Sequence, residues 1–97
     1  MEIYLLEQNW NNDYGTYDSF VVIAENEKEA RLIHPSMYVT HIKDKQWMGT
    51  NTKGGEFKQN SRDWVQLDEI ERIKITHIGK ATDKQEKGVL LASFNAE

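Results

Sequence analysis

The chain has no cysteine among its 97 residues, and it contains only one proline and six glycines. Without cysteine it can form neither disulfides nor zinc-thiolate sites, and it offers no thiol nucleophile. A reducing compartment suits such a chain, so we expect a cytoplasmic protein. The 38% hydrophobic and 29% charged residues are typical of a globular protein, and the length predicts a single domain over residues 1–97.

Long apolar runs and an excess of positive charge are also missing. The N-terminal residues MEIYLLEQNW include only four consecutive apolar residues, so they predict neither a signal peptide nor a membrane span. The net charge of -4 argues against non-specific nucleic-acid binding, which needs an excess of Lys and Arg. The charge is uneven, because residues 36–62 carry five basic and two acidic side chains between two acidic flanks.

The known patterns of catalytic, metal and phosphate sites are absent as well. His34, His41 and His77 are not spaced as paired metal ligands on a helix or strand would be. The stretch NWNNDYGTYD lacks the glycine position and the flanking helices of a calcium loop. No serine lies in a nucleophile elbow, and KGGEF lacks the spacing of a phosphate-binding loop. We therefore predict no catalytic residue, no metal and no cofactor.

Two short apolar runs, IYLL at residues 3–6 and FVVIA at residues 20–24, predict strands that are buried on both faces in the centre of a sheet. The residues between them, 9–18, would form the hairpin loop. Asn26 and Glu29 then have the spacing of a capping box, which predicts a helix of about two turns packed on the sheet.

Pro35 would end this helix, and His34 at its C-terminus is expected to interact with the helix dipole as a cation. YVTHI and KQWMGT, at residues 38–42 and 45–50, indicate two further strands. Residues 51–63 are predicted to be a loop, because they include two adjacent glycines and very little that could be buried.

Residues 64–72 suggest an extended entry to a single helical turn, and residues 73–79 predict a strand. The end of the chain allows two interpretations. One is a single helical turn that a capping box of Thr82 with Gln85 opens and Gly88 closes, followed by the strand VLLASF. The other is a continuous helix over residues 83–94, in which Gly88 would cost about 1 kcal/mol. These elements predict an α+β domain, with an antiparallel or mixed sheet and one or two short helices packed on it.

Aromatic residues are the one positive indication of a binding function. Trp10, Tyr14 and Tyr17 lie in the predicted loop, and Trp47 lies in the basic segment. This is more exposed aromatic surface than a hairpin tip needs. Since Trp and Tyr are frequent in interface hot spots, these residues predict a binding face. The alternative is that their rings close the rim of a small core.

The basic segment at about residues 50–62 is expected to be mobile, because only Phe57 in it could be buried. If this segment is a recognition element, Lys53, Lys58 and Arg62 would meet an acidic partner or phosphate, with Phe57 as the buried anchor. The alternative is a tolerated insertion without a function.

The two ends of the chain resemble a group of small uncharacterised proteins encoded by phages and prophages. The resemblance rests on IYLLEQ…YDSFVVIAENEKEARLIHP and on IKITHIGKA…KGVLLASFNA, and it covers residues 1–36 and 73–97 but not the basic middle. It implies a small cytoplasmic accessory protein of viral origin, a class in which inhibitors of host defence are frequent. It transfers no catalytic residue.

Three hypotheses follow for the function. The first is a non-catalytic binding protein, an inhibitor of a host defence protein of the anti-defence or anti-CRISPR type, whose acidic surface would imitate nucleic acid. The second is an oligomeric sponge for a nucleotide-like signalling molecule. Two sets of side chains would hold that ligand, Trp10, Tyr14 or Trp47 by stacking and Lys43, Lys45 and Lys53 through its phosphates. A small enzyme is the least favoured of the three.

Overall fold

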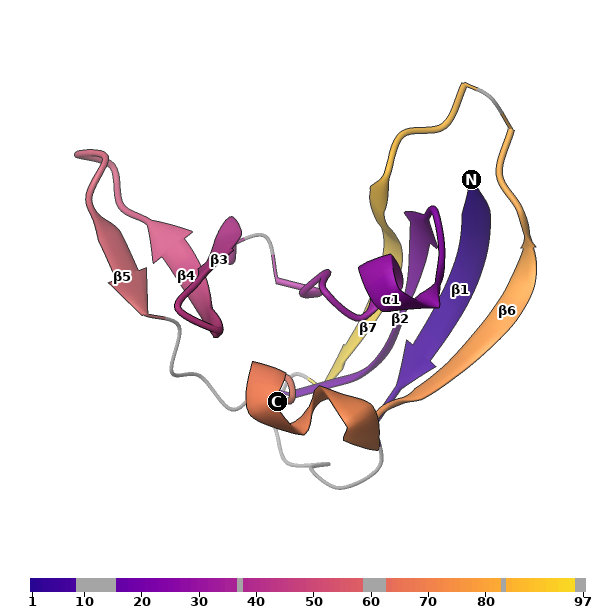
Figure 1. Ribbon diagram of the computed structural model, residues 1–97, viewed down its shortest axis with the longest axis horizontal. Helices are drawn as coiled ribbons and strands as arrows, with labels where there is room; N and C mark the ends of the chain where they lie inside the picture. The colour runs from indigo at the N-terminus through magenta and orange to yellow at the C-terminus, as the bar shows by residue number, and fades with distance from the viewer. Residues whose placement is uncertain (9–15, 37, 59–62, 83, 96–97) are drawn as a thin grey trace.

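Two antiparallel sheets make up most of the computed structural model, which describes residues 1–8, 16–36, 38–58, 63–82 and 84–95 (Figure 1). The larger sheet has the strand order β6-β1-β2-β7, formed by Lys74–Lys80, Glu2–Glu7, Thr16–Ala24 and Gly88–Asn95. The smaller sheet has the order β3-β4-β5, formed by His41–Lys43, Gln46–Thr50 and Glu56–Lys58. The helices are α1, Glu27–Ala30, and the 3-10 helix η1, Leu67–Arg72. The α+β prediction is confirmed in part, because short helices accompany antiparallel strands, but strands dominate and form two sheets.

Strands β1 and β2 lie at the centre of the larger sheet, as their unbroken apolar runs predict. They are antiparallel, with Tyr4 opposite Val22 and Leu6 opposite Phe20. All four side chains are buried, and they belong to the core cluster. The alternation of a strand places the intervening residues on the other face of the sheet.

The hairpin loop predicted over residues 9–18 is too long at its C-terminal end, because β2 already begins at Thr16. Tyr17 is therefore a strand residue, paired with Phe94 of β7. Residues 9–15, which include Trp10 and Tyr14, lie outside the described residues.

Helix α1 begins where the sequence predicts, but it is only one turn long. The Asn26 side chain accepts the N–H of Glu29, and the Glu29 carboxylate accepts the N–H of Glu25, each at 2.9 Å. These bonds satisfy amides at the start of the helix, much as a capping box does. The predicted second turn is wrong, because the N–H groups of Leu32 and Ile33 donate to carbonyls three residues back, which tightens the chain before Pro35.

Strands β3 and β4 are joined by a turn of two residues, Asp44 and Lys45. Their φ angles of 53° and 61° are those of the hairpin turn whose twist matches the flanking strands. The next connection is closed by Asn51, whose side-chain oxygen accepts the N–H groups of Lys53 and Gly55 at 2.9 and 2.8 Å.

This connection leads into β5, so the prediction of a loop over residues 51–63 is wrong at Glu56–Lys58. Phe57 lies opposite Gly49 of β4, and its ring occupies the space that a Cβ at Gly49 would need. The aromatic ring covers the glycine backbone, and this contact explains why a polar stretch joins the sheet. Residues 59–62 lie outside the described residues.

The C-terminal residues form a strand, β7, which pairs antiparallel with β2. The continuous helix over residues 83–94 is therefore wrong. The strand of the alternative is confirmed, but its helical turn is wrong, because the described residues between Ala81 and Lys87 form no helix. The Gln85 N–H donates to the Thr82 carbonyl at 3.1 Å within the turn. Gly88 has a φ of 139°, a conformation that glycine adopts readily, and it opens the strand instead of closing a helix.

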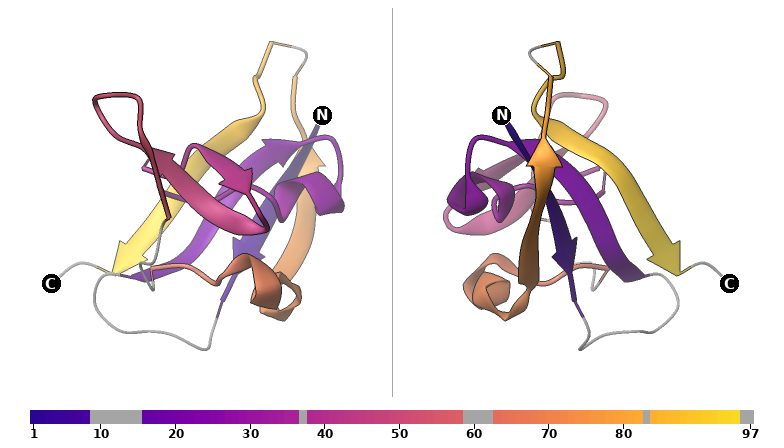
Figure 2. Two further views of the ribbon diagram at one scale, coloured as in Figure 1. Left: turned by 60° about the vertical axis from the view of Figure 1, so that its left-hand side comes forward. Right: turned by 90° about the vertical axis from the view of Figure 1, so that its right-hand side faces the viewer.

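A single core lies between the two sheets. Trp47 from β4 and Trp64 and Val65 from the segment before η1 pack on the buried face of the larger sheet. The Trp64 ring meets the Phe20 ring edge to face, with 4.9 Å between centroids. Figure 2 shows the smaller sheet, α1 and η1 on this same face of the larger sheet. The extended entry and the helical turn predicted at residues 64–72 are confirmed.

Candidate functional site

A groove of about 270 Å³ runs between the turn that follows α1 and strand β3. Its apolar walls come from Leu32 and Ile33 after α1 and from Val39 and Ile42 at β3. The tight turn after α1 buries Ala30 but leaves Leu32 47% exposed. Thr40 and His41 also line the groove. Its aliphatic residues favour an apolar side chain as the occupant, and these two residues add polar groups beside it.

The floor of the groove is formed by Trp47 and His34, which are both buried. Their rings meet edge to face, with 5.0 Å between centroids. The Trp47 Nε1–H donates to the Val65 carbonyl at 3.0 Å, and the His34 Nδ1 accepts the Ser36 N–H at 2.9 Å. Each ring is therefore held by a main-chain group, and the floor is rigid before anything binds.

His34 does not serve as a cation at the helix terminus, and that prediction is wrong. Burial lowers the pKa of its imidazole to about 4, although Asp63 Oδ1 lies 3.6 Å from Nε2. Desolvation disfavours the charged ring more strongly than the carboxylate at this distance favours it. At neutral pH the groove therefore has an uncharged floor.

Tyr17 packs against the core, and its main chain connects β2 to Gln8 and to Asp63. Its N–H donates to the Asp63 carbonyl at 2.8 Å, and its own carbonyl accepts the Gln8 side-chain amide at 2.7 Å. Burial and the Asp63 carboxylate both raise the pKa of the Tyr17 hydroxyl. Of the predicted aromatic binding residues, Trp47 is buried in the core cluster and Tyr17 is partly buried against it, and a role of either in binding stays a prediction.

Two aliphatic side chains border the open side of the groove. Leu32 is 47% exposed and Ile42 is 39% exposed. Ile42 belongs to β3, which is an edge strand and pairs only with β4 among the described strands. The site therefore combines an apolar hollow, two exposed aliphatic residues and an accessible strand edge.

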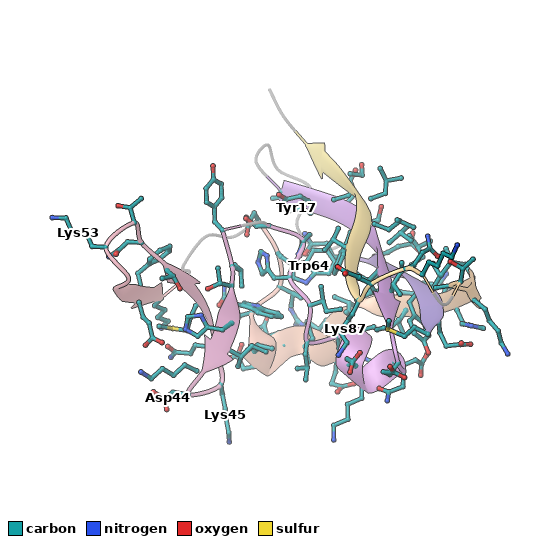
Figure 3. All side chains as sticks on the ribbon, turned by 90° about the horizontal axis from the view of Figure 1, so that it is seen from above. Tyr17, Asp44, Lys45, Lys53, Trp64 and Lys87 are labelled. Carbon is teal, nitrogen blue, oxygen red and sulfur yellow. The ribbon has the colours of Figure 1, made fainter. Side chains whose placement is uncertain are left out.

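The three lysines predicted to hold phosphates do not converge on one point. Lys43 pairs with Glu56 at 2.8 Å, and that carboxylate also meets His41 Nε2 at 3.0 Å. This pairing raises the pKa of Lys43 and lowers that of Glu56. Lys45 and Lys53 lie in the two turns at opposite ends of the smaller sheet (Figure 3). Since Trp47 is also buried, the described residues do not assemble the predicted nucleotide site.

The predicted anchor of the basic segment is not buried. Phe57 is 40% exposed and covers Gly49, and it belongs to β5. Lys58 is also in β5, where it borders a separate opening of about 490 Å³ together with Lys45 and Asp68. Arg62 lies outside the described residues.

Sequence reasoning missed the residues that shape the groove. Leu32 could have been noticed, because it is an apolar residue that does not lie on the face of the predicted helix that carries Ala30 and Ile33. Ile42 offered no such sign, since its exposure depends on β3 being an edge strand. Tyr38 was also missed, and at 70% exposure it presents a large aromatic surface next to Val39.

The described part of the chain contains no group of three or more His, Asp or Glu side chains placed to hold a metal ion. No helix within the described ranges is long and apolar enough to cross a membrane. Both ring nitrogens of His34 already face protein groups, Ser36 and Asp63. The groove is thus suited to binding an apolar group. In comparisons with protein families, curated proteins and solved structures, no match to the chain was found.

Proposed function

We propose that the protein is a non-catalytic binding protein of phage or prophage origin, which inhibits a host defence protein in the cytoplasm by covering part of its surface. The viral context rests on the resemblance of residues 1–36 and 73–97. The observation that supports binding is the groove beside β3, which has a rigid floor and two exposed aliphatic residues at its border.

The partner would insert an apolar side chain between Leu32 and Ile42, over the floor formed by Trp47. Fully burying an aliphatic side chain contributes about 1.5 to 3 kcal/mol, so two half-exposed residues and their counterpart can supply a small hot spot. Among the described strands, β3 has a partner on one side only, and main-chain groups of the bound protein would pair along its other side.

Charge would set the orientation of the complex. The smaller sheet carries Lys43, Lys45, Lys53 and Lys58, whereas the first 35 residues are predominantly acidic. A partner with a complementary arrangement would be steered to the groove, and the rate of association would fall as salt screens these charges.

The proposal is tested in a panel of bacterial strains that carry phage-defence systems. Expression of the chain should restore plating of a sensitive phage on at least one strain, and the immobilised chain should enrich a defence protein from its lysate. The double variant Leu32→Asp/Ile42→Asp should weaken capture by at least about tenfold, or about 1.4 kcal/mol, because it places charge in the apolar contact.

Ile78→Asp is the matched control, since Ile78 is 52% exposed on β6, away from the groove. It should leave capture and plating as in the wild type. The proposal is wrong if no strain is sensitised, or if the groove variant captures and inhibits as well as the control.

A further inference from the structure

Strand β7 lies at an edge of the larger sheet that has few of the features that protect such edges. It pairs with β2 and, among the described residues, with no strand on its other side (Figure 2). Its sequence, GVLLASFN, contains no charged residue and no proline. Val89, Leu90 and Leu91 are 41%, 53% and 68% exposed.

The opposite edge of the same sheet is different. Strand β6 carries Lys74 and Lys80 at its ends, and its pairing with β1 is interrupted by a bulge at Ile78. Charges and bulges are the usual means of preventing a second strand from pairing. The bulge in β7 is at Leu90, near its start. A second irregularity in the pairing is at Asp18 of β2, so β7 itself has no further bulge over Leu91–Asn95.

The outer face of the sheet adds an apolar row that ends at β7. Leu5 of β1 lies opposite Val21 of β2, and Val21 lies opposite Leu91. None of the three belongs to the core cluster, so the row faces away from the smaller sheet. Leu5 and Val21 are partly buried, while Leu91 at the end of the row is largely exposed.

We propose that two copies of the chain form a dimer by antiparallel pairing of β7 with β7 of the second copy, which joins the two larger sheets into one. A second copy fits this edge because a two-fold axis brings together two strands that have no charge. Two chains of net charge -4 repel each other in general, but no like charges on β7 itself would be opposed. The row from Leu5 to Leu91 would continue into the same row of the second copy.

This dimer is independent of the groove, which lies on the other face of the larger sheet, and of the proposed inhibitory function. Its first test is the mass of the chain in solution, measured by light scattering over a range of micromolar concentrations. We expect twice the 11.3 kDa of one chain. Leu91→Lys should raise the dissociation constant at least about tenfold, because a charge would enter an apolar contact between the copies.

Ile78→Lys, on the protected edge, is the matched control and should dimerise as the wild type does. Since Leu91 and Ile78 are both exposed, neither change should alter the circular dichroism of the folded chain. The proposal is overturned if the wild type has the mass of one chain at every concentration measured. It is also overturned if β7 pairs with a strand of another protein while the chain itself stays a monomer. A dimer that Leu91→Lys leaves intact overturns it as well.

A second test uses the absence of cysteine from the natural chain. Leu91 lies at the two-fold axis when the apolar rows of the two copies are continuous, and it is exposed, so Leu91→Cys should form a disulfide-linked dimer when oxidised glutathione is added. Ile78→Cys should remain uncoupled under the same conditions. Equal coupling of the two variants would show random collision and would contradict pairing through β7.

Discussion

His34 is buried beside Trp47, and its two ring nitrogens face the Ser36 N–H and the Asp63 carboxylate. A charged imidazole would lose its hydration there, and the resulting pKa of about 4 lies below the value of 6.5 for an exposed histidine. The unfolded chain therefore binds a proton at His34 at a higher pH than the folded chain does. Stability contributed by this residue is present above pH 6.5 and is lost as the pH falls towards 4.

We expect the free energy of unfolding to decrease by up to about 3 kcal/mol from this residue alone between pH 6.5 and 4. His34→Asn should reduce that decrease, because an amide does not titrate and its oxygen can accept the Ser36 N–H. Urea unfolding at a series of pH values measures how the free energy of unfolding changes with pH in the wild type and in His34→Asn. His77→Asn, on the exposed side of β6, should keep the decrease that His34 causes. Identical slopes for His34→Asn and the wild type would contradict the assignment.

At the scale of elements, the smaller sheet depends on the contact between β4 and β5. The Phe57 ring covers Gly49, and the Tyr38 carbonyl lies 2.6 Å from the position of a Cβ at that glycine. Mobility of the basic segment stays a prediction.

Gly49→Ala should lower the free energy of unfolding by about 1 to 3 kcal/mol, because the added methyl group overpacks this contact. Gly79→Ala is the control, since the nearest atom to its new Cβ would be 4.0 Å away, and it should change stability little. Phe57→Ala combined with Gly49→Ala should recover part of the loss but not all of it, because the Tyr38 carbonyl remains. Chemical denaturation of the four proteins measures these differences. Equal stability of the two glycine variants would show that the Phe57 contact is unimportant.

At the scale of the whole molecule, the two sheets share one core. Trp47 from the smaller sheet belongs to the same buried cluster as Tyr4, Leu6, Phe20 and Val22 of the larger sheet, and its Nε1–H donates to the carbonyl of Val65, next to Trp64. The N-terminal third, which is acidic, and the smaller sheet, which is basic, are thus parts of one folded unit. The groove and the β7 edge occupy opposite faces of that unit.

Because the core is shared, we expect one cooperative unfolding transition, with the same midpoint by tryptophan fluorescence and by far-ultraviolet circular dichroism. Trp47→Phe should move both midpoints together and lower the free energy of unfolding by about 1 to 3 kcal/mol, since the Val65 carbonyl loses its donor. Two separate transitions, or a shift confined to one probe, would contradict a single core.

Features that depend on residues close together in the sequence could be predicted from the sequence alone. The apolar runs at residues 3–6 and 20–24 predict the two central strands, and Asn26 with Glu29 predicts where α1 begins. An apolar run is visible in adjacent residues, and a cap is closed within three residues, so both can be recognised from the sequence.

Which segments contact one another depends on long-range packing, and that packing determines which side chains are buried. VLLASF is compatible with a helix or a strand, and the free side of β2 made it a strand. Trp47 was expected on the surface, but it fills the space between the sheets, and the same packing leaves His34 uncharged. Leu32 and Ile42 became neighbours in one groove because the tight turn after α1 faces β3, a contact that no local pattern specifies.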